Sequence, residues 1–447
     1  MRLHRWIDES LAPSQGGIPQ AQLHRAAYLC LDLLGTYIAG TQTPLYRLLS
    51  RTTPIQFGGR SSSLSGLAGL SPSGVALIDG MTLDSVDAHD GFRMAKGHVG
   101  CGLLPGLIAI NQSLPATTGI AFLQQLVAGY ELGSRLGEAL HASVPDYHTS
   151  GAWIAPTVAA LGSALVGLPD AERDHAMGIA EYHGPRSQMM RGIEFPTMLK
   201  DGSGFGSMVG VSSVYFAQAG MTGAPAITLE HADLESLGST WLIDQQYVKP
   251  YACCRWIHAG IAAVSELAAQ HSIALGDIRQ VRVHSFDAAC SLLQDWPQNT
   301  EQAQYSNRFV IAQALLHSQV LFEQVSQQAI EQAEHSAEFQ ALFAKIQILP
   351  DDQYTQSFPA TRLAHAEIEL NDGAVITGPA TLASGDPERA LSDAQLISKF
   401  ISQASPVVGL KSAQQLADLT LDLGDVADLD QWVQAVQQAL GGGAWTP

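Results

Sequence analysis

Residues 85–105 read SVDAHDGFRMAKGHVGCGLLP, and this stretch concentrates side chains that can move protons or hold anions. It places carboxylates at Asp87 and Asp90 beside imidazoles at His89 and His98, with glycines between them. Histidine titrates near neutral pH, so it suits general acid and base catalysis. Glycines let a backbone approach a ligand closely. The stretch therefore predicts a site where protons are transferred beside a bound molecule.

The lysines indicate the chemistry of that molecule. The chain has only six, and three of them lie in unusual surroundings. Lys96, Lys200 and Lys249 lie in RMAKGHVG, EFPTMLKDGSGFGSMVG and YVKPYACCRWIH, where glycine, proline and aromatic residues surround them. A buried ammonium is costly unless it meets an anion. Either each of the three pairs with an internal carboxylate, or together they line a pocket for an anionic ligand. Nearby arginines favour the pocket: Arg93, Arg191 and Arg255. The remaining lysines are expected to face solvent: Lys345, Lys399 and Lys411.

Other site types match the sequence less well. DGSGFGSMVG lacks the Gly-Lys-Ser/Thr ending of a phosphate-binding loop. His89 and His98 are nine residues apart and lack the spacing of a zinc site, so no metal is expected. Cys254 and His258 could form a thiolate pair for a cysteine hydrolase, but no third member accompanies them.

Composition restricts the partners and the compartment. A net charge of −19 and a pI near 5.1 argue against nucleic acid or an anionic membrane surface as the main partner. No apolar run approaches the ~18 residues of a membrane span, and no signal peptide is evident at the N-terminus. The five cysteines are scattered without metal-site spacing, which is typical of free thiols in a reducing compartment. A cytoplasmic protein is expected.

The elements that would position these residues change in character along the chain. Residues 1–245 predict a helical domain, with apolar and glycine-containing helices over 20–40, 119–142, 155–168 and 204–221 that pack closely. Residues 246–390 predict an α+β domain: strands over 278–286 and 343–350, a hairpin over 365–378 around Asn-Asp-Gly, and helices over 307–320 and 323–346. Residues 391–447 are helical again and are expected to return to the first domain. The fold class is mainly α with an inserted α+β domain.

Four segments, taken in order, resemble the MmgE/PrpD family. They are LDSVDAHDGFRMAKGHVGCGLLPGL, YELGSRLGEAL with YHTSGAW, GIEFPTMLKDGSGFGSMVGVSSVYFAQAGMTGAP, and KPYACCRWIHAGI. That family includes 2-methylcitrate dehydratase, cis-aconitate decarboxylase and iminodisuccinate epimerase. The resemblance implies a large helical domain from both chain ends, a smaller α+β lid from the middle, a homodimer, an active site between the domains, and no metal or organic cofactor.

The resemblance also implies roles for particular residues. Asp87 and Asp90 match the first and last aspartates of an Asp-x-Asp-Asp motif, and His98 matches the active-site histidine that follows. Lys200 matches the lysine before a glycine-rich helix. Two further matches lie in the Lys-Pro-Tyr-like segment: Lys249 and His258.

Some positions depart from the family pattern. His89 stands where an aspartate is usual, and Gly91 stands where the decarboxylase has threonine. Cys254 replaces a histidine of the decarboxylase, and Phe309 replaces an active-site tyrosine. A phenyl ring has no hydroxyl to donate, and a thiol is a poor substitute for imidazole in proton transfer. These changes count against cis-aconitate decarboxylation. Substrate preference is expected at His89, Gly91 and Phe92, and Cys254, Phe309 and His89 are expected to contact the substrate.

These considerations predict a cofactor-independent lyase acting on a small di- or tricarboxylate through an enolate-like intermediate, most simply a 2-methylcitrate dehydratase-like hydro-lyase. Fixed cations would stabilise the charge that develops on carbon beside a carboxylate. Lys200 and Lys249 would bind substrate carboxylates, with Arg93 and Asp90 as further contacts. His98 would be the general acid or base.

Two supporting roles complete this prediction: Asp87 would orient His98 or a lysine, and His258 would carry a second proton transfer. Alternatives are a decarboxylase or an epimerase of a related polycarboxylate, and a non-catalytic dimer that binds a carboxylate.

Overall fold

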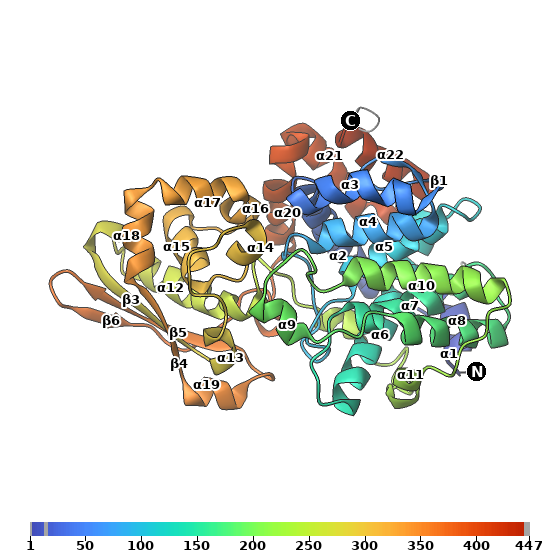
Figure 1. Cartoon of the computed structure of the whole chain (residues 1–447), viewed down its shortest axis with the longest axis horizontal. Coiled ribbons are helices and arrows are strands. Elements are labelled where there is room, and N and C mark those ends of the chain that lie inside the picture. Colours follow the sequence, from blue (N-terminus) through green and yellow to red (C-terminus); the bar gives the residue numbers. More distant parts are fainter. Residues whose placement is uncertain (1, 13–16, 442–447) are drawn as a thin grey trace. The chain divides into compact units, whose positions relative to one another are not determined.

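The computed structural model describes residues 2–12 and 17–441, which divide into two compact units (Figure 1). The first unit runs up to Met189, includes Leu199–Gln246 and resumes at Ser392. The second comprises Met190–Met198 and Tyr247–Leu391. The predicted fold class, mainly α with a smaller α+β part, is confirmed.

Helices build the first unit. Its longer elements are α1 (Arg2–Leu11), α2 (Gln20–Gly40), α3 (Pro44–Gln56), α4 (Pro72–Asp84), α5 (Gly100–Asn111), α6 (Gly119–Ser143), α7 (Gly151–Leu165), α8 (Asp170–His183), α10 (Ser203–Gln218), α20 (Asp393–Val408), α21 (Leu410–Leu421) and α22 (Leu429–Ala439). The short helix α11 (Ile227–His231) joins them, whereas all but the first residue of α9 (Met189–Glu194) belong to the second unit. The helices predicted over 20–40, 119–142, 155–168 and 204–221 are present as α2, α6, α7 and α10.

Glycines set the close packing of α10. A methyl group on Gly204 would lie 2.5 Å from the backbone nitrogen of Met81 in α4, and one on Gly206 would lie 2.5 Å from the carbonyl oxygen of Gly151 in α7. Real Cβ atoms do not approach backbone atoms this closely, so only glycine permits these contacts. The predicted close packing of glycine-containing helices is confirmed, and it fixes the N-terminal end of α10.

Lys399 of α20 contradicts the expectation that it faces solvent. Its side chain is buried, and Nζ forms an ion pair with Asp32 of α2. Nζ also donates to the carbonyl oxygen of Ala88 at 2.7 Å. Asp32 is a buried charge on α2. Packing α2 against α20 therefore requires a positive charge next to this carboxylate. The pair ties the C-terminal helices to the loop that carries the candidate site.

A two-stranded antiparallel ladder also departs from the all-helical prediction for this region. Strands β1 (Gly58–Ser62) and β2 (Ala68–Leu70) connect α3 to α4. Their sequence is rich in glycine and serine and short of the alternating apolar residues that indicate a strand. Backbone hydrogen bonding rather than an apolar pattern therefore defines this hairpin.

The second unit contains a five-stranded sheet covered by helices. The strands are β3 (Ile278–Ser285), β4 (Ile346–Pro350), β5 (Leu363–Leu370), β6 (Val375–Thr377) and β7 (Thr381–Leu382). Their order is β4-β3-β5-β6, with β3 parallel to β4, antiparallel to β5, and β7 paired to β5. The helix α12 (His258–Gln270) packs across β3 and β5, as Figure 1 shows. The predicted strands and the Asn-Asp-Gly hairpin, with Gly373 at φ 88°, are confirmed.

The segment 323–346, which the sequence predicts as one helix, forms three helices in the structure. Residues 323–346 form α16 (Phe322–Val325), α17 (Gln327–Glu334) and α18 (Ala337–Lys345), and the helix over 307–320 is present as α15 (Asn307–His317). Ser326 and Ser336 divide the run because each hydroxyl accepts a hydrogen bond from the next helix's first turn. Serine competes with helical hydrogen bonding in this way and favours N-caps. The apolar periodicity alone did not reveal these two caps.

Two predictions about the whole chain can be compared directly with the structure. All five cysteines are free thiols, as expected. No helix among the described residues is long and apolar enough to cross a membrane.

Asp79 of α4 should make stability depend on pH. Its carboxylate is fully buried, accepts from the Tyr37 hydroxyl at 2.7 Å and from the Leu64 amide at 2.9 Å, and burial raises its pKa to about 7. An unfolded aspartate titrates near 3.9, so between about pH 4 and 7 the folded chain binds the extra proton. Its contribution to stability is complete below about pH 4 and is lost as pH rises through 7.

We therefore expect the free energy of unfolding of the native chain to fall, relative to that of the Asp79→Asn variant, as the pH rises from about 4 to above 7. The difference can reach about 1.4 kcal/mol for each pH unit. Urea unfolding at pH 5 and pH 8 measures it, with exposed Asp418→Asn as the control. Parallel pH curves for the native chain and Asp79→Asn would show that Asp79 has no shifted pKa.

Candidate functional site

His98 stands just before α5 and is held by hydrogen bonds at its backbone and its ring. Its amide donates to the Ser150 hydroxyl at 3.0 Å, and its carbonyl accepts from the Trp153 indole at 2.9 Å. The ring Nδ1 contacts the carbonyl oxygen of Asp90. A carbonyl only accepts, so Nδ1 carries the proton and Nε2 is the nitrogen that gains or loses one. The fold thus fixes one tautomer of a near-buried histidine.

Asp201 lies next to the titrating nitrogen. Its Oδ2 is 3.3 Å from His98 Nε2 and accepts from the Ser150 hydroxyl at 3.2 Å. Charge-assisted N–H···O bonds are about 2.7–2.9 Å long, so the His98 contact is an electrostatic one rather than a tight bond. A carboxylate in this position stabilises the imidazolium and leaves Nε2 able to exchange its proton.

His89 and Asp84 form a layer beneath His98. The rings of His89 and His98 meet edge to face, with centroids 4.3 Å apart. His89 Nδ1 is 3.3 Å from the Asp90 carbonyl oxygen, and Nε2 is 3.5 Å from Asp84 Oδ1. His89 is fully buried, so it supports His98 rather than meeting a substrate from solvent. Asp87, also buried, is close enough to contribute to the raised pKa of Asp84.

The Asp90 side chain is likewise fully buried and points away from this layer. It accepts a hydrogen bond from the Tyr130 hydroxyl, and burial raises its pKa to about 7. A methyl group on Gly100 would come within 2.5 Å of the Asp90 carboxylate and 2.3 Å of the Tyr130 hydroxyl. Asp90 therefore anchors the loop in the core, and its backbone carbonyl is the part that acts on His98.

Lys200 interacts electrostatically with Asp84 of this layer. It is buried, and its charge lowers the pKa of Asp84, although burial dominates and raises that pKa to about 6. Asp84 Oδ2 accepts from the amides of Asp201 at 3.2 Å and Ser203 at 3.1 Å, which pins the residues that follow the lysine. Lys200 thus acts on Asp84, which belongs to the same cluster as His89 and His98. That Lys200 and His98 act in one site stays a prediction.

Backbone strain coincides with the candidate lysines. Lys96 has φ 53° and Lys200 has φ 49°, and the described chain has only two other non-glycine residues at positive φ, Ser272 and Ser318. A left-handed conformation is uncommon for residues with a Cβ and persists only where surrounding contacts impose it. Such residues gather at functional sites, so this observation supports a role for both segments.

Three helix N-termini converge here. Helix α5 begins at Gly100, α7 at Gly151 and α10 at Ser203. The Gly151 amide donates to the Asp201 carbonyl at 3.1 Å, and the Cys101 thiol donates to the Ser203 hydroxyl at 3.0 Å. Helix N-termini carry partial positive charge and bind carboxylates or phosphates. Together with Lys200, they make this end of the first unit favourable for an anion.

Arg93 and Lys96 lie on a tight loop that precedes His98. Phe92 and Gly97 pair across it, and the Tyr147 hydroxyl donates to the Lys96 carbonyl. The Lys96 ammonium stands 5.9 Å from the Tyr147 ring centre. Both cationic side chains are half-buried, so they can reach solvent beside the more buried His98.

The remaining candidates belong to the second unit. Lys249 is almost fully buried, and so is Cys254. His258 Nδ1 accepts from the Arg255 guanidinium at 3.0 Å, while Nε2 lies 3.1 Å from the Cys253 carbonyl and so carries the proton. Arg255 also pairs with buried Asp386 at 2.7 Å. Both nitrogens of His258 are engaged, which supports a structural role and not the predicted second proton transfer.

Phe309 packs inside the second unit. Its ring is fully buried, with its centroid 5.1 Å from that of Phe339 and 5.8 Å from that of Trp296. The structure shows this ring in a packing role, and its contact with a substrate stays a prediction.

One group of side chains near His98 resembles a metal site by distance alone. Ligand atoms of Asp84, His89 and Cys101 lie within 4.8 Å of one another. A thiol binds metal as the thiolate, but burial raises the pKa of Cys101 well above its usual range, and its proton is donated to Ser203. Asp84 Oδ2 already accepts hydrogen bonds from the backbone amides of Asp201 and Ser203. The group matches a hydrogen-bonded network better than a metal centre.

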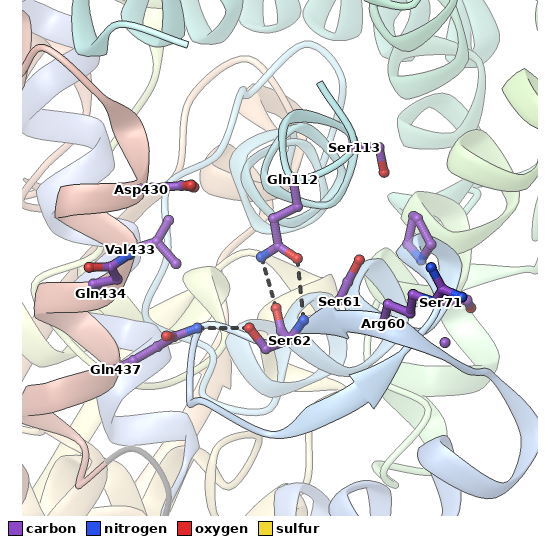
Figure 2. Close-up of a pocket in the computed structure, with 12 residues that line it drawn as sticks. Arg60, Ser61, Ser62, Ser71, Gln112, Ser113, Asp430, Val433, Gln434 and Gln437 are labelled. Atoms are coloured by element: carbon purple, nitrogen blue, oxygen red, sulfur yellow. Dashed lines mark hydrogen bonds between the residues drawn. The ribbon is translucent and has the colours of Figure 1, made fainter. Parts of the chain in front are cut away.

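A polar hollow of about 530 Å³ lies elsewhere in the first unit (Figure 2). Gln112 bonds both backbone groups of Ser62, and Gln437 donates to the Ser62 hydroxyl at 3.1 Å. Arg60 and Asp430 are the charged residues among those that line it. It contains none of the candidate residues, and the hydrogen bonds across it hold the β1–β2 hairpin in place.

Sequence reasoning missed Asp84, Ser150 and Asp201. Asp84 and Asp201 lie within or beside the quoted motifs, and Ser150 is in YHTSGAW. A carboxylate directly after Lys200 was the available signal for Asp201. Their contacts span more than 50 residues of chain, so local spacing could not predict them.

The first unit therefore presents the parts of an acid–base enzyme for an anionic substrate: an oriented histidine, a buried lysine and converging helix N-termini. Comparison with known proteins agrees with this class. The model of the MmgE/PrpD N-terminal domain matches residues 13–235, and that of the MmgE/PrpD C-terminal domain matches residues 251–424. The chain belongs to the MmgE/PrpD family and is an enzyme of its lyase type.

Relatives match almost the full length at low identity. Cis-aconitate decarboxylase of Aspergillus terreus is 23% identical, covering 92% of this chain and 91% of the relative. Cis-aconitate decarboxylase of Homo sapiens is 24% identical, covering 94% and 92%. Cis-aconitate decarboxylase-like protein oryM of Aspergillus oryzae is 24% identical, covering 98% and 97%.

Proposed function

We propose that this protein is a lyase that acts on a small di- or tricarboxylate through an enolate-like intermediate, without a metal or organic cofactor. The observation that carries this proposal is His98: its Nδ1 is committed to the Asp90 carbonyl, and its Nε2 lies beside Asp201. The buried Lys200 acts on Asp84, which is part of the same cluster of side chains. An oriented imidazole and a buried cation supply the two functions that such a lyase needs, proton transfer and stabilisation of carbanion charge.

In the hydro-lyase form of the proposal, His98 Nε2 removes a proton from the carbon beside a substrate carboxylate. The electron pair left on carbon is stabilised through that carboxylate by Lys200 and the helix N-termini. It then forms a carbon–carbon double bond as the carbon–oxygen bond breaks, and the leaving hydroxyl group takes up the proton that the His98 imidazolium gives back, so that water is released. Asp201 stabilises the imidazolium formed at His98 until the proton is passed on. A 2-methylcitrate-like hydroxytricarboxylate has the groups that this sequence of steps requires.

A decarboxylase is the second candidate, because the relatives named above are cis-aconitate decarboxylases or similar to them. In that reaction a carbon–carbon bond breaks, carbon dioxide leaves, and the imidazolium of His98 returns a proton to the carbanion. The same cations would stabilise the same kind of charge. Phe309 and Cys254, which replace a tyrosine and a histidine in the family pattern, favour the hydro-lyase.

Two assays separate these reactions. The purified chain is incubated with 2-methylcitrate, citrate and cis-aconitate, while alkene absorbance and released carbon dioxide are measured. We expect absorbance to rise with 2-methylcitrate without carbon dioxide. Carbon dioxide release from cis-aconitate would establish the decarboxylase instead, and polarimetry with iminodisuccinate tests epimerisation. Tight binding of these acids without any turnover would overturn the enzymatic proposal in favour of a carboxylate-binding protein.

We also propose that the chain forms a homodimer, as the family resemblance implies. Helix α10 carries Phe205 and Phe216, 11 residues or about three turns apart on one face, and both are about half exposed. Leu199, before the helix, is 72% exposed. An apolar surface of this kind on one element is typical of a protein–protein interface, and a second copy of the chain is the occupant we propose.

A further inference from the structure

We propose that the second unit holds a binding site for a divalent transition-metal ion of the zinc class, formed by His284, His365 and Glu367. This site uses none of the residues placed in the proposed chemistry. It lies on the face of the sheet whose side chains alternate with the buried residues Val283 and Ala366.

Strand pairing brings the three side chains together. His284 of β3 pairs directly with His365 of β5, and Glu367 follows two residues later on the same face of β5. The two imidazoles lie parallel with their centroids 4.4 Å apart, and His284 Nε2 is 3.8 Å from Glu367 Oε2. Ligand atoms of all three residues lie within 4.8 Å of one another. Ligands of a tetrahedral ion are about 3.3 Å apart given metal–ligand distances of about 2.0–2.2 Å. In the proposed site, rotation of the two rings about χ2 is the movement that brings the ligand atoms to this spacing when the ion binds.

The hydrogen bonds around these rings suit metal binding. Within the described part of the chain, His284 Nε2 is buried and has no hydrogen-bond partner. The Tyr354 hydroxyl of α19 (Asp352–Ser357) lies 3.0 Å from His365 Nδ1, which leaves Nε2 of that ring for an ion. Metal-binding histidines generally use their second nitrogen for such a partner, which fixes the orientation of the ring.

The charges around the site agree with this assignment. The neighbouring cation Arg282 has its closer contact with Glu369, at 2.8 Å, and stands 3.7 Å from Glu367. Two imidazoles and one carboxylate, half exposed, match Zn²⁺ with a water molecule at a fourth position.

Isothermal titration of the metal-stripped full chain with ZnSO4 tests the site. We expect saturable binding that weakens at least about tenfold in His365→Ala and in Glu367→Gln. Exposed His317→Ala, in the same unit, is the matched control and should bind as the native chain does. Circular dichroism without metal shows whether each variant is folded. A thermal melt should show that Zn²⁺ stabilises the native chain and the control more than either variant, since only an intact site binds the ion tightly in the folded state.

Electron paramagnetic resonance with Cu²⁺ gives a second readout, because two bound imidazoles produce nitrogen hyperfine structure that His284→Ala should reduce. Two results would overturn the proposal. The first is an unchanged Zn²⁺ affinity in a folded His284→Ala/His365→Ala variant. The second is a Zn²⁺ affinity of the native chain no greater than the affinity that its cysteine thiols alone account for.

Discussion

Replacing His98 by glutamine is expected to lower kcat by about 10²–10⁴-fold, the usual contribution of a positioned acid–base group. Glutamine retains a polar side chain of similar length, and the loop is held independently by Ser150, Trp153 and the Asp90–Tyr130 contact. The fold should therefore survive. Steady-state rates with the substrate found in the assays above measure the effect.

The matched control for this prediction is His183→Gln, which alters an exposed histidine of α8 and should leave kcat unchanged. Thermal melts of both variants should resemble that of the native chain. Near-native turnover by folded His98→Gln would exclude His98 as the proton-transfer group and leave the lysines as the remaining candidates in the first unit.

Replacing Lys200 by methionine is expected to reduce kcat/KM by about 10²–10³-fold, the loss seen when one preorganised donor to a developing anion is removed. Methionine keeps much of the apolar stem and removes only the charge. The same change should raise the pKa of Asp84 further above 6, because the Lys200 charge now lowers it. The assay is kcat/KM with the carboxylate substrate, and Lys411→Met on the exposed face of α21 is the control.

A second variant separates charge from backbone strain at this position. Lys200→Gly removes the ammonium but accepts φ 49° without strain. We expect it to be at least as stable as the methionine variant and equally inactive. Lys200→Arg keeps the charge but changes its geometry, so partial activity is expected. Full activity of the glycine variant would show that Lys200 serves the backbone and not the substrate.

Much of the architecture could be predicted from the sequence. Apolar periodicity placed α2 and α10, alternating residues placed β3 and β5, and Asn-Asp-Gly placed the hairpin, because these signals depend on neighbours only a few residues away. The division of 323–346 into three helices was missed, since two serine caps decided it. The β1–β2 hairpin was missed because glycine and serine give no apolar alternation.

The candidate site was predicted in its residue types and only partly in its geometry. The crowding of histidine and aspartate in 85–105 and the unusual setting of Lys200 were visible in the sequence, and the family resemblance added polycarboxylate chemistry as an expectation. Burial of Asp90 and Phe309, and the engagement of both His258 nitrogens, could not be inferred, because each depends on what packs around a side chain.

The sequence by itself determined the family, the helical and α+β segments, and the loop that carries His98. Only the tertiary structure decided which nitrogen of His98 exchanges its proton, that Asp201 lies beside it, and that Lys399 is buried against Asp32. The physical reason is the range of the interactions. Helix and strand patterns depend on local periodicity. The hydrogen bonds, burial and pKa shifts of the site arise between residues that are distant in the chain, and these residues meet only after α4, α5, α7 and α10 have packed together.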